Sequence, residues 1–317
     1  MARRSRKPKG YQDINGILLL NKPLGLSSNK ALQAARHIFK ANKAGHTGSL
    51  DPLATGMLPI CFGEATKISG HLLDASKTYV TKCQLGITTE TGDAEGAVTS
   101  ENPVNVTRSQ INQVLQDFTG VLQQTPPMYS AIKHNGQRLY NLARAGKVVE
   151  RESRQIEIYE IKLVEFNQVE FEQAELNKDV LTFFIHCSKG TYIRTLIEDI
   201  GQRLGCGAYI TELNREAVQP FWDEQVYTLD ELRDIAENES QQLDDCLLPV
   251  NAALDEWPIV ELDDDMSYYL RQGQPVQVPR APLTGLLCLM AETGEFIGIG
   301  HVLSDGRIAP KRLVQIN

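Results

Sequence analysis

Apolar runs separated by polar, glycine-rich turns organise most of the chain. Residues 14–20 form one such run and predict a buried strand that ends in the turn NKPLGLSS. Ser27 or Ser28 can cap the helix that follows, whose apolar side chains recur at helical spacing as far as Phe39. The apolar run MLPICFG at 57–63 predicts another strand that enters a core.

The middle of the chain continues this mixture of helical and strand patterns. Residues 107–120 predict a helix with a capping-box pair at its start. Residues 155–166 and 180–187 alternate apolar and polar positions like paired strands. Residues 192–200 predict a helix, and from about residue 258 the pattern changes to short strands with glycine at hairpin turns.

Length and composition describe a globular chain of about two domains. The chain has 317 residues, of which 42% are hydrophobic and 23% charged. It has no apolar run of about 18 residues, so we expect no membrane span. The basic N-terminus lacks the apolar core of a signal peptide. Six cysteines without a CxxC pair argue against a zinc site and a disulfide framework, and favour a reducing cytoplasm.

Charge is distributed unevenly along the chain. The net charge is −8, which by itself argues against a nucleic-acid partner. Residues 1–70, however, hold eleven Lys and Arg against three Asp and Glu, whereas residues 216–265 hold one against sixteen. A polyanion could therefore bind the basic end, although a basic tail is also compatible with a solvated arm. We expect the acidic segment to face away from such a partner.

One carboxylate, Asp51, lies in a window that is otherwise small, hydroxylated or apolar: AGHTGSLDPLATGMLPICFG. Three glycines allow tight turns and close approach of another molecule, and Pro52 restricts the backbone just after the acid. The window predicts an acid on a rigid loop beside a buried strand. Taken alone, the Asp-Pro pair also fits an ordinary turn.

Aromatic side chains and cations interleave in a second window, QTPPMYSAIKHNGQRLYNLARAG at 124–146. Tyr129 and Tyr140 lie among lysine, histidine and arginine residues, as in loops that contact RNA. Composition alone equally allows a surface helix.

The string GHTGSLDPLATGMLPICFGEATK resembles the signature of the TruB-type tRNA pseudouridine synthases. The strings KTY at 77–79, PPMYSAIKHNGQRLYNLAR and GTYIRTLIEDI resemble further signatures of that family, in the same order. The resemblance covers most of residues 14–215. It implies an isomerase that converts uridine 55 in the T-loop of tRNA to pseudouridine by base flipping, with no cofactor, no metal and no guide RNA.

The resemblance also implies roles for individual residues. Asp51 would be the nucleophile, Arg194 its ion-pair partner, and Tyr79 a ring that stacks on the target base and a candidate general acid or base. His46 would fill the position that the flipped base leaves, and Leu213 would form an apolar wall of the uracil pocket. The remaining implied substrate-site residues are Lys22, Pro23, Asp93, Lys133 and Tyr192.

The fold implied by the resemblance is α+β, with a mixed, mainly antiparallel sheet flanked by helices. We expect a basic arm at 1–12, a catalytic domain at 13–257 with an inserted thumb loop at about 124–152, and an all-β PUA-like RNA-binding domain at 258–317. The family acts as a monomer in the cytoplasm without an obligate protein partner. One departure is Asn214-Arg215 where relatives often carry two arginines, which leaves a phosphate contact there open.

Alternatives remain for both the function and the chemistry. A guide-dependent synthase would share the reaction, and a tRNA-binding or folding module would not depend on Asp51. A glycosidase is disfavoured because its mechanisms usually require two carboxylates. In the synthase, Asp51 could deprotonate C2′, attack C1′ or add to C6 of uracil, and Asp51, Tyr79 or water could take the C5 proton.

Overall fold

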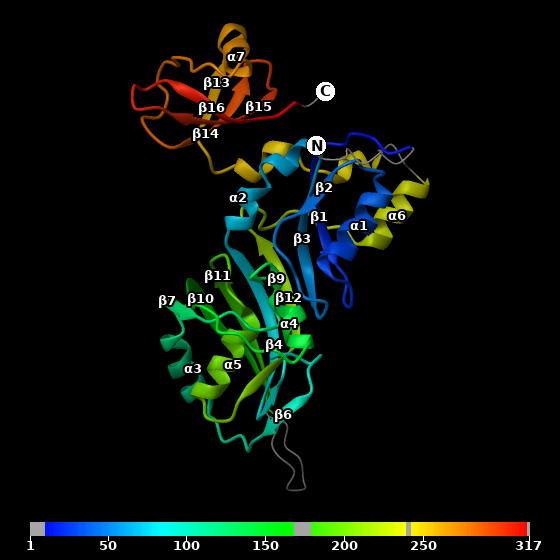
Figure 1. The fold of residues 1–317 in the computed structure, drawn as a ribbon, viewed down its shortest axis with the longest axis vertical. Helices are drawn as coiled ribbons and strands as arrows, with labels where there is room; N and C mark the ends of the chain where they lie inside the picture. The colour runs from blue at the N-terminus through cyan, green and yellow to red at the C-terminus, as the bar shows by residue number, and fades with distance from the viewer. Residues whose placement is uncertain (1–9, 168–178, 239–241, 316–317) are drawn as a thin grey trace. The chain divides into compact units, whose positions relative to one another are not determined.

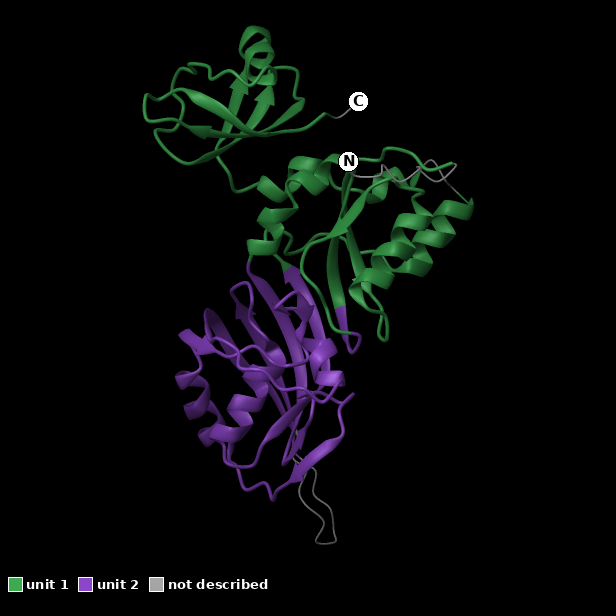
Figure 2. Ribbon diagram, viewed as in Figure 1, with its two compact units in different colours: residues 1–51, 56–75, 218–317 green, residues 52–55, 76–217 purple. Residues whose placement is uncertain are grey.

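A computed structural model describes residues 10–167, 179–238 and 242–315 (Figure 1). The chain divides into two compact units, shown in Figure 2. Unit 1 combines residues 1–51, 56–75 and 218–317, and unit 2 combines residues 52–55 and 76–217. Each unit is therefore built from segments that are distant in the sequence.

Unit 1 is built around an apolar antiparallel strand pair. β1 (Gly16–Lys22) pairs with β3 (Ala54–Phe62), so that Lys22 lies opposite Gly56. β2 (Ala44–His46), which the sequence pattern did not predict, also pairs with β3. Nearly every β1 and β3 side chain is buried, as expected for strands that read as continuous apolar runs.

Helices cover these strands. α1 (Ser28–Ile38) confirms the predicted helix, and the Ser27 side chain caps it by accepting from the Lys30 amide. It lies beside α6 (Leu229–Asn238), as Figure 1 shows. The other short helical segments of unit 1 are η1 (Gly63–Lys67), α2 (Ser69–Asp74), η3 (Asp244–Cys246) and η4 (Val250–Leu254).

The C-terminal part of unit 1 contains a four-stranded sheet, which confirms the expected small β-tail. Its strands, in spatial order, are β13 (Ile259–Leu262), β14 (Leu286–Ala291), β15 (Phe296–Val302) and β16 (Ile308–Leu313). The strand pairs are antiparallel except for β13 with β14. A helix, α7 (Asp264–Arg271), was not predicted. The Asp263 side chain caps it.

The N-terminal arm is tied down where the description of the chain begins. Residues 1–9 lie outside the described residues. The Gln12 amide donates to the Lys40 carbonyl at 2.8 Å, and the Tyr11 hydroxyl lies 3.0 Å from His37 Nδ1. Tyr11 and Gln12 therefore belong to the folded unit and not to a free arm.

Unit 2 has a larger sheet with the strand order β12-β4-β11-β10-β7. These strands are β12 (Ala208–Val218), β4 (Lys77–Leu85), β11 (Val180–Cys187), β10 (Arg154–Asn167) and β7 (Gly120–Gln124). The antiparallel pairing of β10 with β11 confirms the predicted strand pair. A second, two-stranded sheet consists of β5 (Ile87–Thr89) and β6 (Val98–Glu101).

Two helices pack beside each other in unit 2, as Figure 1 shows. α3 (Arg108–Asp117) has the predicted capping box between Thr107 and Gln110. α5 (Ile193–Arg203) buries Leu196, Ile197 and Ile200. The thumb loop, residues 124–152, holds β8 (Lys133–His134), β9 (Gln137–Arg138) and α4 (Leu139–Arg144). The mixture of strands and helices confirms the α+β class.

Candidate active site

The backbone just before Asp51 is fixed by a hydrogen bond and a glycine turn. Thr47 is fully buried, and its amide donates to the Pro59 carbonyl at 3.0 Å. Gly48 has φ +85°, a conformation that L side chains rarely adopt, so the turn before Asp51 depends on glycine. Asp51 itself is partly exposed, as a reactive carboxylate that meets a substrate must be.

Ser28 fixes the residue immediately before Asp51. Its buried hydroxyl donates to the Leu50 carbonyl at 2.9 Å and accepts from the Leu50 amide at 2.7 Å. Both polar groups of a buried backbone unit are thereby satisfied. Sequence reasoning considered Ser27 and Ser28 only as caps. The doubled serine was the available signal: Ser27 caps α1, while Ser28 secures Leu50.

Lys22 supports the turn that follows β1. Its side chain is fully buried, and Nζ donates to the carbonyls of Pro23 (2.8 Å) and Leu26 (2.7 Å). The chain folds around the ammonium group, which is not simply solvated. Pro23 is exposed on the same turn. His46, at the end of β2 opposite Ile60, is half-buried in the same unit.

Arg194 is the most enclosed cation of unit 2 among the predicted site residues. It lies in the first turn of α5 and is 5% exposed. Nη1 donates to the Thr91 carbonyl at 2.9 Å, and Nη2 donates to the Tyr129 carbonyl at 2.8 Å. Nη1 also lies 3.4 Å from Asp93 Oδ2. These oxygens offset the unfavourable position of a cation at a helix N-terminus and fix the guanidinium plane.

Asp93 is a buried acid that several groups hold in place. Its carboxylate is 2% exposed, and it accepts from the Thr91 hydroxyl and, at 3.1 Å, from the Glu95 amide. It is thus a hydrogen-bonded turn residue and also the carboxylate that faces Arg194. A buried carboxylate of this kind requires such partners to remain charged.

Glu198, one helical turn after Arg194, was missed by the sequence reasoning. Burial raises the pKa of Glu198 to about 7; Arg194 lowers it in part, while Asp199 and Asp93 raise it further. Glu198 packs closely against the backbone of Gly92, where only glycine leaves enough room: a Cβ there would lie 2.7 Å from the Glu198 carboxyl carbon. The spacing on α5 was the only signal for Glu198 in the sequence.

Tyr79 and Leu213 lie on neighbouring strands of unit 2, β4 and β12. Each is 8% exposed. The two strands are joined nearby, where the Thr81 hydroxyl donates to the Glu212 carbonyl at 2.8 Å. An aromatic ring and an aliphatic side chain on adjacent strands can form the apolar part of a base pocket.

Asn214 and Arg215 are neighbouring residues of β12. The Thr55 hydroxyl donates to Asn214 Oδ1 at 3.0 Å, so Asn214 anchors the chain four residues after Asp51. Arg215 is 1% exposed and is therefore not a surface cation.

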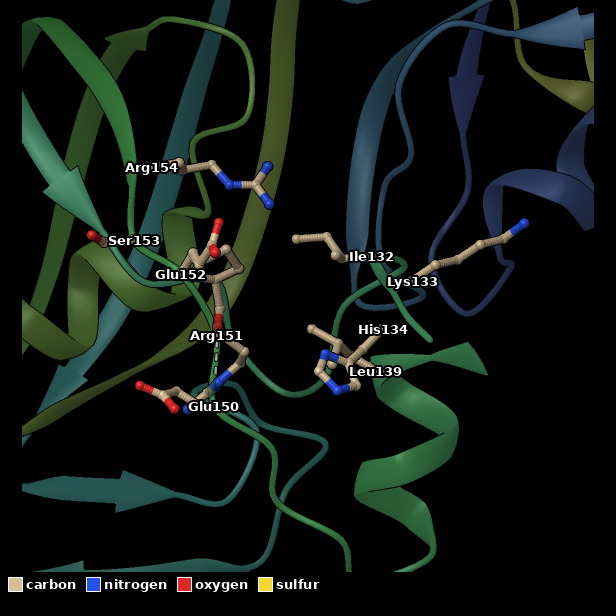
Figure 3. A pocket seen from close by; sticks show the side chains of 10 residues that line it. Ile132, Lys133, His134, Leu139, Glu150, Arg151, Glu152, Ser153 and Arg154 are labelled. Atoms are coloured by element: carbon tan, nitrogen blue, oxygen red, sulfur yellow. Dashed lines mark hydrogen bonds between the residues drawn. The ribbon is translucent and has the colours of Figure 1, made fainter. Parts of the chain in front are cut away.

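Lys133 lies within the thumb, and Tyr192 contacts Gln124 at its base. Tyr192 is the N-cap residue of α5, and the Arg154 guanidinium lies 5.9 Å from the centre of its ring. Lys133, on β8, is exposed and lines a cavity of about 670 Å³. Figure 3 shows Ile132 and Leu139 on one side of this cavity and Glu152 and Arg154 on the other, with the Lys133 side chain directed away from them.

The two units divide the predicted site residues. Unit 1 holds Lys22, Pro23, His46 and Asp51, and unit 2 holds the others. Within unit 2, Arg194 forms an ion pair with Asp93. The pairing of Arg194 with Asp51 stays a prediction. Within the described residues there is no group of three or more His, Cys, Asp and Glu arranged to hold a metal ion.

Models of known protein families match most of the chain. The model of the TruB family pseudouridylate synthase N-terminal domain matches residues 36–193. Two models of TruB C-terminal domains match residues 194–255 and 258–314. Relatives named tRNA pseudouridine synthase B include those of Stutzerimonas stutzeri (51% identical; 96% of this chain and 97% of the relative covered) and Nitrosococcus oceani (52%; 96% and 96%). This chain belongs to the TruB family.

Two solved structures are similar to this chain in their three-dimensional fold. A chain in the structure of a Cbf5-Nop10-Gar1 complex is 25% identical, with a TM-score of 0.69, over 95% of this chain and 85% of that chain. A chain in an H/ACA RNP bound to a substrate RNA is 22% identical, with a TM-score of 0.71, over 98% and 93%. The second likeness establishes the fold alone. Family membership makes the chain a pseudouridylate synthase, and so an enzyme.

Proposed function

We propose that this TruB-family enzyme isomerises uridine 55 in the T-loop of tRNA to pseudouridine, without a guide RNA. The observation that carries the proposal is Asp51, the one carboxylate between Ala44 and Gly63, on a loop that Thr47 and Ser28 hold in place. The tRNA substrate is supported by relatives more than 50% identical over nearly their whole length, each named for tRNA.

The reaction moves C1′ of the ribose from N1 to C5 of the same uracil. No external oxidant, reductant or group donor enters the balance, so a single nucleophile suffices. Asp51 either acts at the ribose, at C2′ or C1′, or adds to C6 of uracil. The C5 proton leaves after the base has rotated and rejoined, and Asp51, Tyr79 or water accepts it, while N1, which has lost its bond to C1′, takes up a proton.

Arg194 and Tyr79 serve this chemistry in different ways. A guanidinium beside Asp51 would keep the carboxylate ionised and oriented. The fixed orientation of Arg194 on three oxygens supports this role, because a rigid cation needs no rearrangement when the substrate arrives. The Tyr79 ring would stack on the flipped base against Leu213, a contact worth about 1–3 kcal/mol. His46 would occupy the vacated place in the RNA stack.

The thumb and the basic N-terminal region would hold the RNA backbone. Lys133, Arg138 and Arg144 are exposed on the thumb. The guanidiniums of Arg138 and Arg144 lie 5.9 and 5.7 Å from the Tyr140 ring, an aromatic–cation cluster of the kind that contacts RNA bases. The C-terminal sheet would be the PUA-like module that extends this contact. The protein would act as a monomer in the cytoplasm; among the described residues no helix has the length and apolarity to cross a membrane.

The proposal is tested by mapping pseudouridine at single-nucleotide resolution in an unmodified tRNA transcript. The purified wild type and Asp51→Asn are incubated with the transcript and no other component. Asp223→Asn is the matched control, because it removes the same charge from an exposed surface position. We expect conversion at uridine 55 by the wild type and by Asp223→Asn, and none by Asp51→Asn.

Other outcomes would redirect the proposal in distinct ways. Conversion at another uridine would keep the chemistry and replace the substrate position. A requirement for an added RNA would favour the guide-dependent class. No conversion with tight tRNA binding, and full complementation in cells by Asp51→Asn, would identify a binding or folding module.

A further inference from the structure

Gln124 makes a paired contact with the backbone of Tyr192. Its Oε1 accepts from the Tyr192 amide at 2.8 Å, and its Nε2 donates to the Tyr192 carbonyl at 3.1 Å. The Gln124 side chain is 3% exposed. Both ends of a buried amide are thus used on one residue, 68 positions away in the sequence.

This contact lies at the junction of two functional segments. Gln124 is the last residue of β7 and the first of the thumb loop. Tyr192 precedes the first residue of α5, and its carbonyl also accepts the Leu196 amide at 3.0 Å. The Tyr192 side chain makes no capping hydrogen bond to α5, and Gln124 instead bonds the Tyr192 backbone where the first helical turn begins. That turn carries Arg194.

A second contact joins the same two segments. Arg194 Nη2 donates to the carbonyl of Tyr129, five residues into the thumb, at 2.8 Å. The thumb base is closed in turn by Arg151, whose Nη1 donates to the Pro126 carbonyl at 3.1 Å. A displacement of the thumb base would therefore move the Arg194 side chain through its bond to Tyr129. It would also move the helical turn that carries Arg194, through the bonds between Gln124 and Tyr192.

We infer that Gln124 is a positioning residue, which holds Arg194 in its working orientation and couples it to the placement of the thumb. Gln124 itself need not touch the RNA. This inference rests on the proposed function, in which the Arg194 guanidinium acts beside the nucleophile. Small displacements of such a group are costly: a shift of about 1 Å can reduce a rate by about 100-fold.

The test separates the chemical step from RNA binding. Gln124→Met keeps the length and volume of the side chain and removes both hydrogen bonds. Gln123→Met is the matched control, since Gln123 is the neighbouring residue of β7 and is exposed. We expect Gln124→Met to lower the single-turnover rate of pseudouridine formation by about 10- to 100-fold, while the Kd for tRNA changes less than about threefold.

A spectroscopic readout follows Arg194 directly. In the wild type labelled with ¹⁵N-arginine, the hydrogen-bonded guanidinium NH₂ groups of Arg194 should rotate slowly and give resolved signals, assigned by their loss in Arg194→Lys. Gln124→Met should broaden or merge these signals, and Gln123→Met should leave them unchanged.

The outcomes distinguish this inference from the proposed function. If the wild type converts uridine 55 and Gln124→Met converts it equally fast, the inference is wrong and the function stands. An equal loss of rate, tRNA affinity and thermal stability would reduce Gln124 to a purely structural role and also overturn the inference. Inactive wild type would contradict the proposed function instead. If Gln124→Met does not fold, Gln124→Glu, which keeps the acceptor for the Tyr192 amide, is judged by the same criteria.

Discussion

The segment that presents Asp51 and the thumb loop differ in how they are held. Residues 44–46 pair with β3, the Thr47 amide donates to the Pro59 carbonyl, and Ser28 bonds both backbone groups of Leu50. In the thumb, by contrast, many side chains are exposed, both in the hairpin β8–β9 and helix α4 and in the residues that follow them. Val148, for example, is 80% exposed. At the base of the thumb, Gln124 bonds the N-cap residue of α5 and the Tyr129 carbonyl accepts from Arg194.

This difference fits the tasks that the proposed function gives to the two segments. A nucleophile benefits from a position fixed before the substrate arrives, because no reorganisation is then needed during the reaction. A segment that closes on a large, irregular RNA benefits from few buried contacts, since these allow low-cost movement. Arg194 contacts the thumb base through the Tyr129 carbonyl, so it is subject both to the need for a fixed position and to the movement of the thumb.

After the loss of activity expected for Asp51→Asn, the largest expected effect is that of Arg194→Lys. A lysine keeps the positive charge beside Asp93 but lacks the planar fork from which Nη1 and Nη2 donate separate hydrogen bonds to the Thr91 and Tyr129 carbonyls. We expect the single-turnover rate to fall by about 10²–10³-fold. The tRNA affinity should stay within about threefold, because buried Arg194 makes no phosphate contact in this scheme. Rapid-quench kinetics and filter binding check both values, and an unchanged rate would remove Arg194 from the site.

Ser28→Ala tests the rigidity of the Asp51 segment. Both backbone groups of Leu50 lose their partner, which should cost about 1–3 kcal/mol in the free energy of unfolding. The single-turnover rate should fall by about 10-fold or more because Asp51 is the next residue. Ser27→Ala is the matched control: it removes the cap of α1, costs about 1 kcal/mol and should leave the rate intact. Equal rates for both variants would contradict the assigned role of Ser28.

The thumb should show the opposite behaviour. The double variant Lys133→Ala/Arg138→Ala should weaken tRNA binding and lower the slope of log K against log[salt] by about 1 for each phosphate that is no longer neutralised. Its free energy of unfolding should change by less than about 0.5 kcal/mol, since both side chains are exposed. Lys162→Ala, on β10 away from the thumb, is the control for charge. A salt slope equal to that of the wild type would argue against thumb contacts with phosphate.

The smallest effect concerns Glu198. Its pKa is raised to about 7 in the folded protein from 4.5, so the folded state binds the proton more tightly than the unfolded state. Stability is therefore lost as the pH rises from about 4.5 through 7. After allowance for solvent screening, Glu198→Gln should raise the Tm by about 2–4 °C at pH 8. It should have little effect at pH 4.5, and calorimetry at the two pH values gives the comparison.

The sequence was sufficient where local chemistry decides the structure. β4 lies where the KTY window predicted a strand, and the Thr107 capping box forms as its spacing indicated. Apolar periodicity located α1 and α5, because each buries one face against a neighbouring layer. The family signatures located the candidate site residues along the chain.

The remaining features depend on partners distant in the sequence. β2 is only three residues long and exists through its pairing with β3. The hydroxyl of Ser28 bonds a residue 22 positions later, and Gln124 bonds one 68 positions later. No local pattern marks such contacts. The burial of Lys22, which folds back on its own turn, likewise follows from the packing of β1 and not from its residue type.

Amide hydrogen exchange, measured by mass spectrometry with and without tRNA, tests the contrast between the two segments most directly. Peptides covering residues 45–52 should exchange slowly in the free protein and change little on binding. Peptides covering residues 131–147 should exchange fast in the free protein and slowly in the complex. Fast exchange at 45–52 that slows only when tRNA binds would show that the Asp51 segment is ordered by its substrate, and would contradict a preformed site.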